Sequence, residues 1–504
     1  MTLEHVDVLI VGAGLSGVGA AHELQTRCPS KRLLLLEARD CIGGTWDLFR
    51  YPGIRSDSDM YTLGYRFRPW KGDRALADGP AILEYVRETA REAGIDQKIR
   101  FHHKVVRASW SSDARRWTVE AVRTDTGEQV RLTASFLYNC SGYYRYEAGY
   151  TPEFPGIERF QGQVLHPQLW PESLDYRGKK VIVIGSGATA VTLVPSMADE
   201  AAHVTMLQRS PTYIISVPGR DPLARLMRDH LPEELAYAVT RWKNITLNAA
   251  LYQLCQRRPR LVRGLLRAAV KHQLPPGYDV DTHFNPRYDP WDQRLCAVPD
   301  GDLFKAISRG KVSIVTDTIE TFTETGLRLT SGATLDADIV VTATGFTLQM
   351  MGGAELVVDG RPVDLSEHLT YKGMMLSDVP NSAFTIGYTN SSWTLKADLV
   401  ADYVCRLLNH MDARGQEVCV ARNRDHGMKR SPLMDFGAGY VKRSLAGLPK
   451  QGSKWPWKLG MNYAVDVVRL RHGEIDDGVM EFTSARREPQ QAAGAAPTLG
   501  AATG

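Results

Sequence analysis

An apolar strand near the start of the chain runs into a glycine-rich turn that could bind a pyrophosphate. Val6 to Val11 precede Gly12, Gly14 and Gly17 in the spacing G-x-G-x-x-G, and a helical stretch follows. These glycines allow a tight turn, close approach of a pyrophosphate and close packing of helix on strand. A second apolar strand ends at Glu37, whose carboxylate can accept hydrogen bonds from a ribose diol. We predict a dinucleotide site without a 2′-phosphate, which suits FAD.

The same pattern occurs a second time, with a different residue at the tip of the second strand. Gly185, Gly187 and Ala190 follow the apolar strand Val181–Ile184, and the next strand leads to Arg209 instead of an acid. A carboxylate would repel a 2′-phosphate, whereas a guanidinium can bind one through paired hydrogen bonds. We therefore predict that the second site binds NADPH and that the enzyme reduces a flavin with a nicotinamide.

The cysteines argue against one class of enzyme with two such sites. Disulfide reductases need two cysteines close in sequence, and Cys28 and Cys41 are too far apart for that motif. The chain has seven cysteines without a C-x-x-C pair, so we predict neither a metal site nor a redox disulfide, and we expect a reducing, cytoplasmic compartment.

Two further motifs carry a resemblance to a known family. Phe160, Gly162, His166 and Trp170, followed by Pro171, fit F-x-G-x-x-x-H-x-x-x-W-[P/D]. A second motif fits throughout, at Gly43, Gly44, Trp46, Tyr51, Pro52, Gly53 and Asp57. The chain thus resembles the Baeyer–Villiger monooxygenases, a branch of the class B flavoprotein monooxygenases. From about Val6 to Phe482 it is similar to their ethionamide monooxygenase-like subgroup.

The resemblance implies a mechanism and assigns residues to it. In this family NADPH reduces FAD, O₂ forms a C4a-peroxyflavin, and this attacks a ketone to give an ester or lactone; thioamides and thioethers can also be oxidised. The family's active-site arginine falls on Arg294, with Asp57 as its carboxylate partner. Gln293 stands where many members have a lysine that aids the 2′-phosphate, which leaves more of that role to Arg209.

Other residues are given supporting roles by their places in the motifs. Gly44, Thr45 and Trp46 follow the second strand of the FAD unit and are expected near that cofactor. His166 and Trp170 lie between the two units, and we interpret them as elements that couple domain movement. We do not assign acid–base catalysis to them, and for His166 a structural role is at least as good an interpretation as a direct chemical one. Trp393 either lines the substrate side or belongs to the core.

The elements that must position these residues form an α/β protein with two Rossmann-like domains. Its 504 residues, 43% hydrophobic and 23% charged, are typical of a globular protein of two to four structural units. We expect a discontinuous FAD-binding domain, an inserted NADP-binding domain with a helical insertion, and a disordered tail. The predicted ranges are 1–146 and 318–482 for the FAD domain, 147–317 for the NADP domain, about 221–280 for the insertion and 489–504 for the tail.

Several alternatives remain open at this stage. The enzyme could be an S- or N-oxygenase without productive ketone insertion, or the chain could be a redox-responsive flavoprotein that docks on a membrane or partner. Residues 236–278 contain no acid and many basic residues among leucines at helical spacing, as in a surface-binding helix or in the solvated face of an insertion. We expect small ketone or organosulfur substrates with O₂, no nucleic acid, no signal peptide and no membrane span, with peripheral membrane contact left open.

Overall fold

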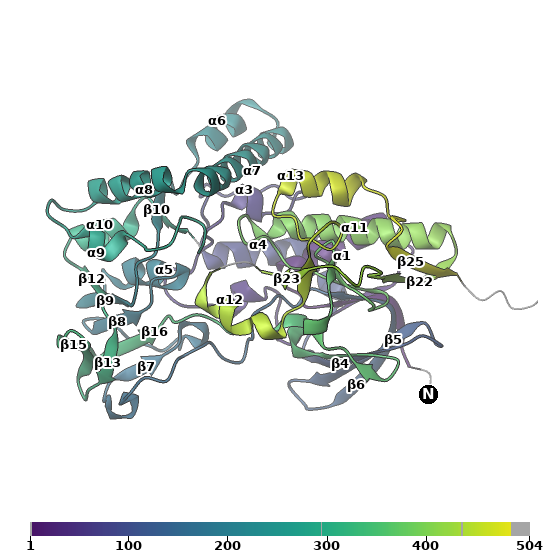
Figure 1. The fold of residues 1–504 in the computed structure, drawn as a ribbon, viewed down its shortest axis with the longest axis horizontal. Coiled ribbons are helices and arrows are strands. Elements are labelled where there is room, and N and C mark those ends of the chain that lie inside the picture. Colours follow the sequence, from purple (N-terminus) through teal and green to yellow (C-terminus); the bar gives the residue numbers. More distant parts are fainter. Residues whose placement is uncertain (1–2, 294, 435–436, 485–504) are drawn as a thin grey trace, which may run out of the picture.

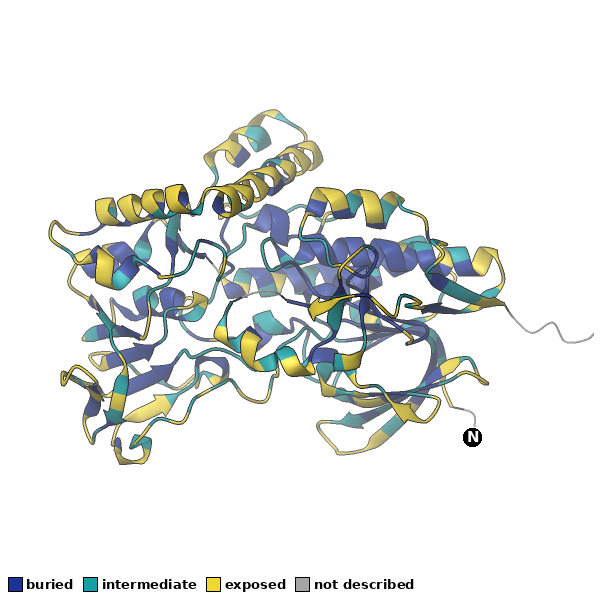
Figure 2. Ribbon diagram, viewed as in Figure 1, coloured by how far each residue is buried: buried dark blue, intermediate teal, exposed yellow. Residues whose placement is uncertain are grey.

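The computed structural model describes residues 3–293, 295–434 and 437–484. It contains two α/β units side by side, with a group of helices along one edge (Figure 1). Buried residues concentrate in the sheets and in the helices packed on them, whereas the helices along that edge are largely exposed (Figure 2).

The first unit is built on a nine-stranded sheet in the order β18-β17-β4-β5-β6-β1-β2-β3, with β21 pairing with β6. Hydrophobic residues make up all of β2 and Val8–Val11 of β1, so these stretches can be buried on both faces. The strands are β1 His5–Val11, β2 Leu33–Leu36, β3 Ile99–Arg100, β4 His103–Ser111, β5 Arg116–Arg123, β6 Gln129–Asn139, β17 Glu355–Val358, β18 Arg361–Pro362 and β21 Ser382–Phe384.

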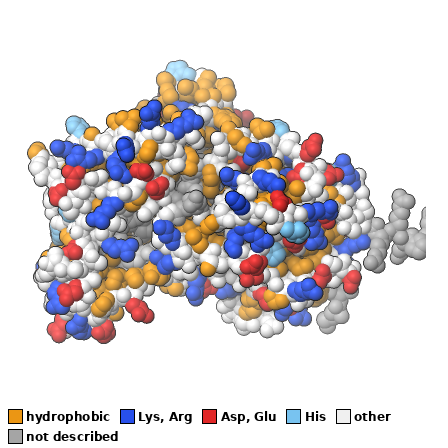
Figure 3. Space-filling model, in the orientation of Figure 1, with side chains coloured by type: hydrophobic (Ala, Val, Ile, Leu, Met, Phe, Trp, Pro, Cys, Tyr) orange, Lys and Arg blue, Asp and Glu red, His pale blue; other side chains and the backbone are white. Residues whose placement is uncertain are grey.

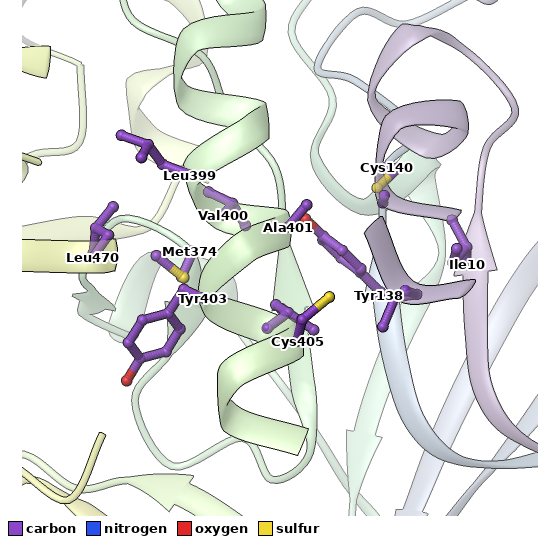
Figure 4. Close-up of a cluster of buried hydrophobic side chains, with 14 of the residues drawn as sticks. Ile10, Tyr138, Cys140, Met374, Leu399, Val400, Ala401, Tyr403, Cys405 and Leu470 are labelled. Carbon is purple, nitrogen blue, oxygen red and sulfur yellow. The ribbon is translucent and has the colours of Figure 1, made fainter. Parts of the chain in front are cut away.

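Helix α1 packs against both α4 and α11 in this unit, and α11 is buried along most of its length. Figure 4 shows Leu399, Val400 and Ala401 of α11 in the same cluster as Tyr138 of β6 and Ile10 of β1. The core therefore joins the first strand of the chain to a helix almost 400 positions later. The helices are α1 Leu15–Arg27, α2 Thr45–Leu48, α3 Met60–Leu63, α4 Gly79–Glu92 and α11 Trp393–Ala413.

The second unit is a five-stranded parallel sheet in the order β12-β9-β8-β16-β7. Helices α5 and α10 contact each other, and β10 pairs with β11 beside them. A small sheet of β13, β14 and β15 precedes β16. The elements are β7 Gln163–Leu165, β8 Lys180–Ile184, α5 Ala188–Met197, β9 His203–Gln208, β10 Ile214–Val217, β11 Cys296–Pro299, α10 Asp302–Ser308, β12 Val312–Thr316, β13 Ile319–Phe322, β14 Gly326–Leu329, β15 Thr334–Asp336 and β16 Ile339–Thr342.

This topology corrects one expected boundary. We expected the chain to return to the first unit at residue 318, yet β16 pairs in parallel with both β8 and β7 of the second sheet. The return therefore comes after Thr342. An apolar strand is equally suited to either sheet, so its composition alone did not reveal its partners.

Helices α6 to α9 form the excursion from the second unit: α6 Pro222–His230, α7 Glu233–Arg257, α8 Pro259–Gln273 and α9 Val280–Phe284. Within the described ranges, no helix is both long enough and apolar enough to cross a bilayer. The later part of the chain contributes β19 Thr370–Tyr371, β20 Met375–Leu376, β22 Gln416–Ala421, β23 Arg430–Pro432, α12 Gly439–Ser444, β24 Lys450–Gly452, α13 Tyr463–Asp466 with a π-helical turn Val467–His472, and β25 Met480–Ser484. The predicted tail, 489–504, lies outside the described residues.

Candidate active site

A cavity of about 880 Å³ is lined by the turn after β1 and by the turn after β8, so its walls come from both units. Most of the predicted cofactor residues line it: Gly12, Gly14, Glu37, Gly44, Thr45, Trp46, Asp57, Gly185, Gly187 and Arg209. Gly17, Ala190, Phe160, Gly162, His166 and Trp170 are not among its lining residues. Arg294 lies outside the described residues, although Gln293 beside it lines the cavity.

The first turn is closed so tightly that only glycine fits at two of its positions. Gly12 has a φ of +101°, and a Cβ there would lie 2.8 Å from the carbonyl oxygen of Cys140. A Cβ on Gly17 would lie 1.9 Å from the carbonyl oxygen of Gly12. Gly17 therefore serves helix packing from behind the turn, as predicted from its place in the motif.

Glu37 is held at the end of β2 by backbone N–H groups. Its Oε2 accepts from the Ala13 N–H at 2.7 Å and its Oε1 accepts from the Arg39 N–H at 3.0 Å. Burial raises the pKa of this carboxyl group, and the hydrogen bonds from Ala13 and Arg39 oppose the rise. Each carboxyl oxygen has a further lone pair, so the group can also accept from a ribose diol.

The second turn differs in that one of its glycines faces open space. Gly185 has a φ of +132°, and a Cβ there would lie 2.3 Å from the carbonyl oxygen of Ala343. A Cβ on Gly187, by contrast, would meet nothing within 4 Å, and Gly187 lines the cavity. Arg209, directly after β9, is exposed and lines the cavity at the strand end that corresponds to Glu37.

These two turns fit the two nucleotides. Each precedes a helix, α1 or α5, with no acidic residue in its first turn, so the N–H groups there can bind an anion. The open space at Gly187 permits a pyrophosphate to approach the backbone. The acid follows the first unit's second strand and the arginine follows the second unit's, as expected for FAD and NADPH.

The loop that carries the Gly43–Asp57 motif is fixed by a buried carboxylate that the sequence analysis did not single out. Asp47 of α2 is 2% exposed and forms ion pairs with Arg39, Arg50 and Arg87. Burial opposes ionisation of Asp47, but hydrogen bonds from Arg39 and Cys41 and the positive charges of Arg39 and Arg50 together outweigh it, so the pKa of Asp47 is lowered. The glycines before α2 have positive φ, so Thr45 and Trp46 are placed beside the first turn.

An aromatic wall closes another part of the cavity. Trp393 and Tyr143 stack with their centroids 5.0 Å apart, and the Trp393 Nε1–H donates to Ser16 Oγ at 2.7 Å. Trp393 lines the cavity and also packs against the hydrophobic core of the first unit. Tyr388, also in the wall, donates its hydroxyl to the buried Asp466 at 2.7 Å.

Asp466 holds a second partner at the same oxygen. The Lys396 ammonium donates to its Oδ2 at 2.9 Å, and both Lys396 and Asp466 are buried. Because Tyr388 and Asp466 are 78 positions apart, no local pattern in the sequence could have indicated this network.

The motif between the two units, Phe160 to Trp170, which we call the linker motif, lies behind the cavity. A Cβ on Gly162 would lie 2.4 Å from the carbonyl oxygen of Asp338, so glycine lets β7 enter beside β16. Phe160 is buried against Phe322, and Trp170 packs on the core of the second unit.

His166 uses both ring nitrogens. Its Nε2–H donates to the carbonyl oxygen of Gly345 at 3.0 Å, and its Nδ1 accepts from the Gln168 N–H at 3.1 Å. Burial lowers the pKa of this imidazole, which is neutral in this arrangement. Gly345 lines the cavity, so His166 contacts its wall without facing into it.

The chain belongs to the flavin-binding monooxygenase-like family, whose model matches residues 76–386, more than half of its length. A model of the NAD(P)-binding Rossmann-like domain matches residues 10–72. The protein is therefore an FAD-containing, NADPH-dependent monooxygenase, and the two predicted nucleotide-binding α/β units are confirmed.

Relatives match almost the entire chain. It is 58% identical over 480 residues to the FAD-containing monooxygenase EthA of Mycobacterium tuberculosis, covering 95% of this chain and 98% of that protein. It is 55% identical over 484 residues to EthA of Mycolicibacterium smegmatis, covering 96% and 98%. The predicted resemblance to the Baeyer–Villiger branch and its ethionamide monooxygenase-like subgroup is confirmed.

Solved structures share the fold at low sequence identity. Oxidised steroid monooxygenase bound to NADP superposes with a TM-score of 0.73 at 23% identity, covering 95% of this chain and 100% of that one. OTEMO in complex with FAD and NADP gives a TM-score of 0.73 at 20% identity, covering 95% and 99%.

Proposed function

We propose that the protein is a Baeyer–Villiger monooxygenase that also oxidises organosulfur compounds. A ketone, O₂, NADPH and a proton would give an ester or lactone, NADP⁺ and water. The observation that carries the proposal is the shared cavity, which both nucleotide turns and an aromatic wall line. Such a wall suits an apolar substrate, and a site between two units is a common place for a ligand.

The residues at the two turns and at the ends of the strands that follow would bind the two cofactors and distinguish FAD from NADPH. Glu37 would accept hydrogen bonds from the FAD ribose, and the backbone around Gly14 would bind the pyrophosphate. Gly187 and Arg209 would do the same for the pyrophosphate and 2′-phosphate of NADPH. Bound FAD supplies a ring that takes a hydride from NADPH and activates O₂.

Two charged residues are assigned to the oxygenation step. We assign Arg294 to stabilising the negative charge that develops on the substrate's former carbonyl oxygen. The electrostatic effect of a fixed cation is larger where water is excluded. Asp57 lines the cavity and would hold the guanidinium in place. The assignment of Arg294 follows from the family resemblance, since this residue lies outside the described ranges.

The proposal is tested by analysing products. Purified enzyme with NADPH and O₂ is given a cyclic ketone in one reaction and an aryl methyl thioether in another. We expect lactone and sulfoxide, each formed in step with NADPH consumption. Sulfoxide without lactone, across ketones of graded chain length, would instead identify an S-oxygenase. NADPH consumption that yields only hydrogen peroxide would contradict both assignments.

A further inference from the structure

Exposed hydrophobic side chains are concentrated on a few neighbouring helices. Of the 15 exposed large hydrophobic residues in the described ranges, 11 lie on α6, α7, α8 and α13 with its π-helical turn. We call this set the apolar ridge: Leu223, Leu226, Leu235, Val239, Trp242, Leu247, Leu254, Leu261, Leu265, Val465 and Val468. Scattered exposed leucines are ordinary, but a concentration of this kind marks an interaction surface.

The helices of the ridge contact one another. α7 packs against both α6 and α8, and Trp242 of α7 lies 5.7 Å from Tyr463 of α13, measured between ring centroids. Figure 3 shows hydrophobic side chains gathered at the top of the molecule, over α6 and α7, with Lys and Arg side chains close by. In α8, Val262 and Leu266 face the core, which leaves Leu261 and Leu265 on the outside.

The end of the ridge at α7 and α8 is flanked by unpaired positive charge, whereas the exposed Asp229 and Glu234 lie at its α6 end. Arg257, Arg258, Arg260 and Lys271 are exposed, and none has an ion-pair partner among the described residues. Residues 236–278 contain no Asp or Glu at all. An occupant of this surface must therefore offer both an apolar layer and negative charge.

We propose that the ridge docks on a lipid bilayer with anionic headgroups. Leucine, valine and tryptophan side chains can enter the boundary below the headgroups while arginine and lysine bind the headgroups themselves. A second copy of this chain fits less well, because a two-fold contact through the ridge would bring its unpaired cations towards each other.

The inner face of α7 connects this surface to the cavity. The buried Arg241 donates to the carbonyl oxygens of Tyr61 and Gly64, at 2.7 Å in each case. Asn244 donates to Asp59 at 2.8 Å, two positions from Asp57 in the cavity wall. A bilayer at the ridge would thus lie one helix away from the loop that carries Asp57.

Vesicle sedimentation tests the proposal with the full-length, FAD-loaded enzyme. Vesicles of phosphatidylglycerol and phosphatidylcholine are compared with vesicles of phosphatidylcholine alone, at low and high salt. One variant combines Leu261→Ser with Leu265→Ser, and a second combines Arg257→Gln, Arg258→Gln and Arg260→Gln. The control combines Leu3→Ser with Val106→Ser, two exposed hydrophobic residues (47% and 38%, against 55% and 57% for Leu261 and Leu265) that lie outside the ridge.

We expect the wild type and the control to sediment with the anionic vesicles and to be released by salt. The arginine variant should bind about 100-fold more weakly, from three lost charges near the surface, and the leucine variant at least ~10-fold more weakly. FAD content and thermal stability should match the control. Absence of vesicle binding, or equal loss in the control, would overturn the proposal. So would concentration-dependent dimers that the leucine variant abolishes, which would identify a second copy as the occupant.

Discussion

The two glycines of the second turn should respond in opposite ways to the same substitution. Gly187→Ala places a methyl group where nothing lies within 4 Å, at a backbone conformation (φ −77°, ψ −176°) that alanine adopts freely. Gly185→Ala places it 2.3 Å from the carbonyl oxygen of Ala343, at a φ of +132°. The first change should therefore affect NADPH binding and the second should affect folding.

The magnitudes follow from these contacts. A residue forced into a glycine-only conformation costs roughly 1–3 kcal/mol, and moving the backbone of Ala343 adds to this, so Gly185→Ala should cost at least about 3 kcal/mol. For a unit of this size that lowers Tm by about 6–12 °C. Gly187→Ala should leave Tm within about 1 °C, because the entropy lost by the unfolded chain offsets a small capping difference.

For NADPH binding, Gly187→Ala should have the larger effect of the two substitutions. A methyl group on Gly187 separates the pyrophosphate from a backbone donor, and one charge-assisted hydrogen bond contributes about 1.5–3 kcal/mol. The KM for NADPH should rise about 10- to 100-fold, while FAD content is unchanged. Thermal unfolding and initial rates of NADPH oxidation measure the two effects separately. An unchanged KM in Gly187→Ala would refute the assigned path of the pyrophosphate, and equal stability of the two variants would refute the packing argument.

Three further predictions concern charged residues. Arg209→Ala should raise the KM for NADPH about 10- to 100-fold, the value of one charge-assisted hydrogen bond, with little change for NADH; equal changes for both nucleotides would contradict a contact of Arg209 with the 2′-phosphate. Arg294→Ala should still reduce flavin, measured by stopped-flow bleaching, yet form little ester or sulfoxide; wild-type turnover would contradict its assignment. Burial raises the pKa of Asp398 to about 6, although Arg241 pairs with it, so the fold binds this proton more tightly than the unfolded chain does. This tighter proton binding stabilises the fold by about 3 kcal/mol below pH 4, and the stabilisation is lost as the pH rises through 6. Asp398→Asn should therefore flatten this part of the Tm–pH curve, and an unchanged slope would contradict the prediction.

Local patterns predicted the parts of the site that local geometry builds. The positions of Gly12 and Gly185 were evident from sequence, because a strand, a tight turn and a helix must follow one another within about 20 residues. Glu37 and Arg209 could be predicted for the same reason, since each directly follows the second strand of its unit. The cavity-lining positions of Gly44, Thr45, Trp46 and Asp57 came from motif matching, because their spacing alone does not indicate a cavity.

Long-range contacts were beyond the reach of the sequence. The prediction placed β16 in the first unit, which is wrong, because the composition of an apolar strand does not indicate which sheet it joins. The sequence did not indicate the role of Asp47, because its partner Arg87 comes from α4, 40 positions later in the chain. The contact of Tyr388 with Asp466 depends on how the late segments fold over α11.

Because β16 belongs to the second unit, the cavity lies at the two crossings, the places where the chain passes from one unit to the other. The chain leaves the first unit after β6 and returns after β16, and residues directly after both strands line the cavity, among them Ser141 and Gly345. Any relative movement of the two units must be taken up in these crossings, because the strands before them are fixed in their sheets. His166 donates its hydrogen bond to the carbonyl oxygen of Gly345, in the second crossing. We therefore propose that the histidine of the linker motif couples the two units through the backbone that connects them, a role that needs no proton transfer.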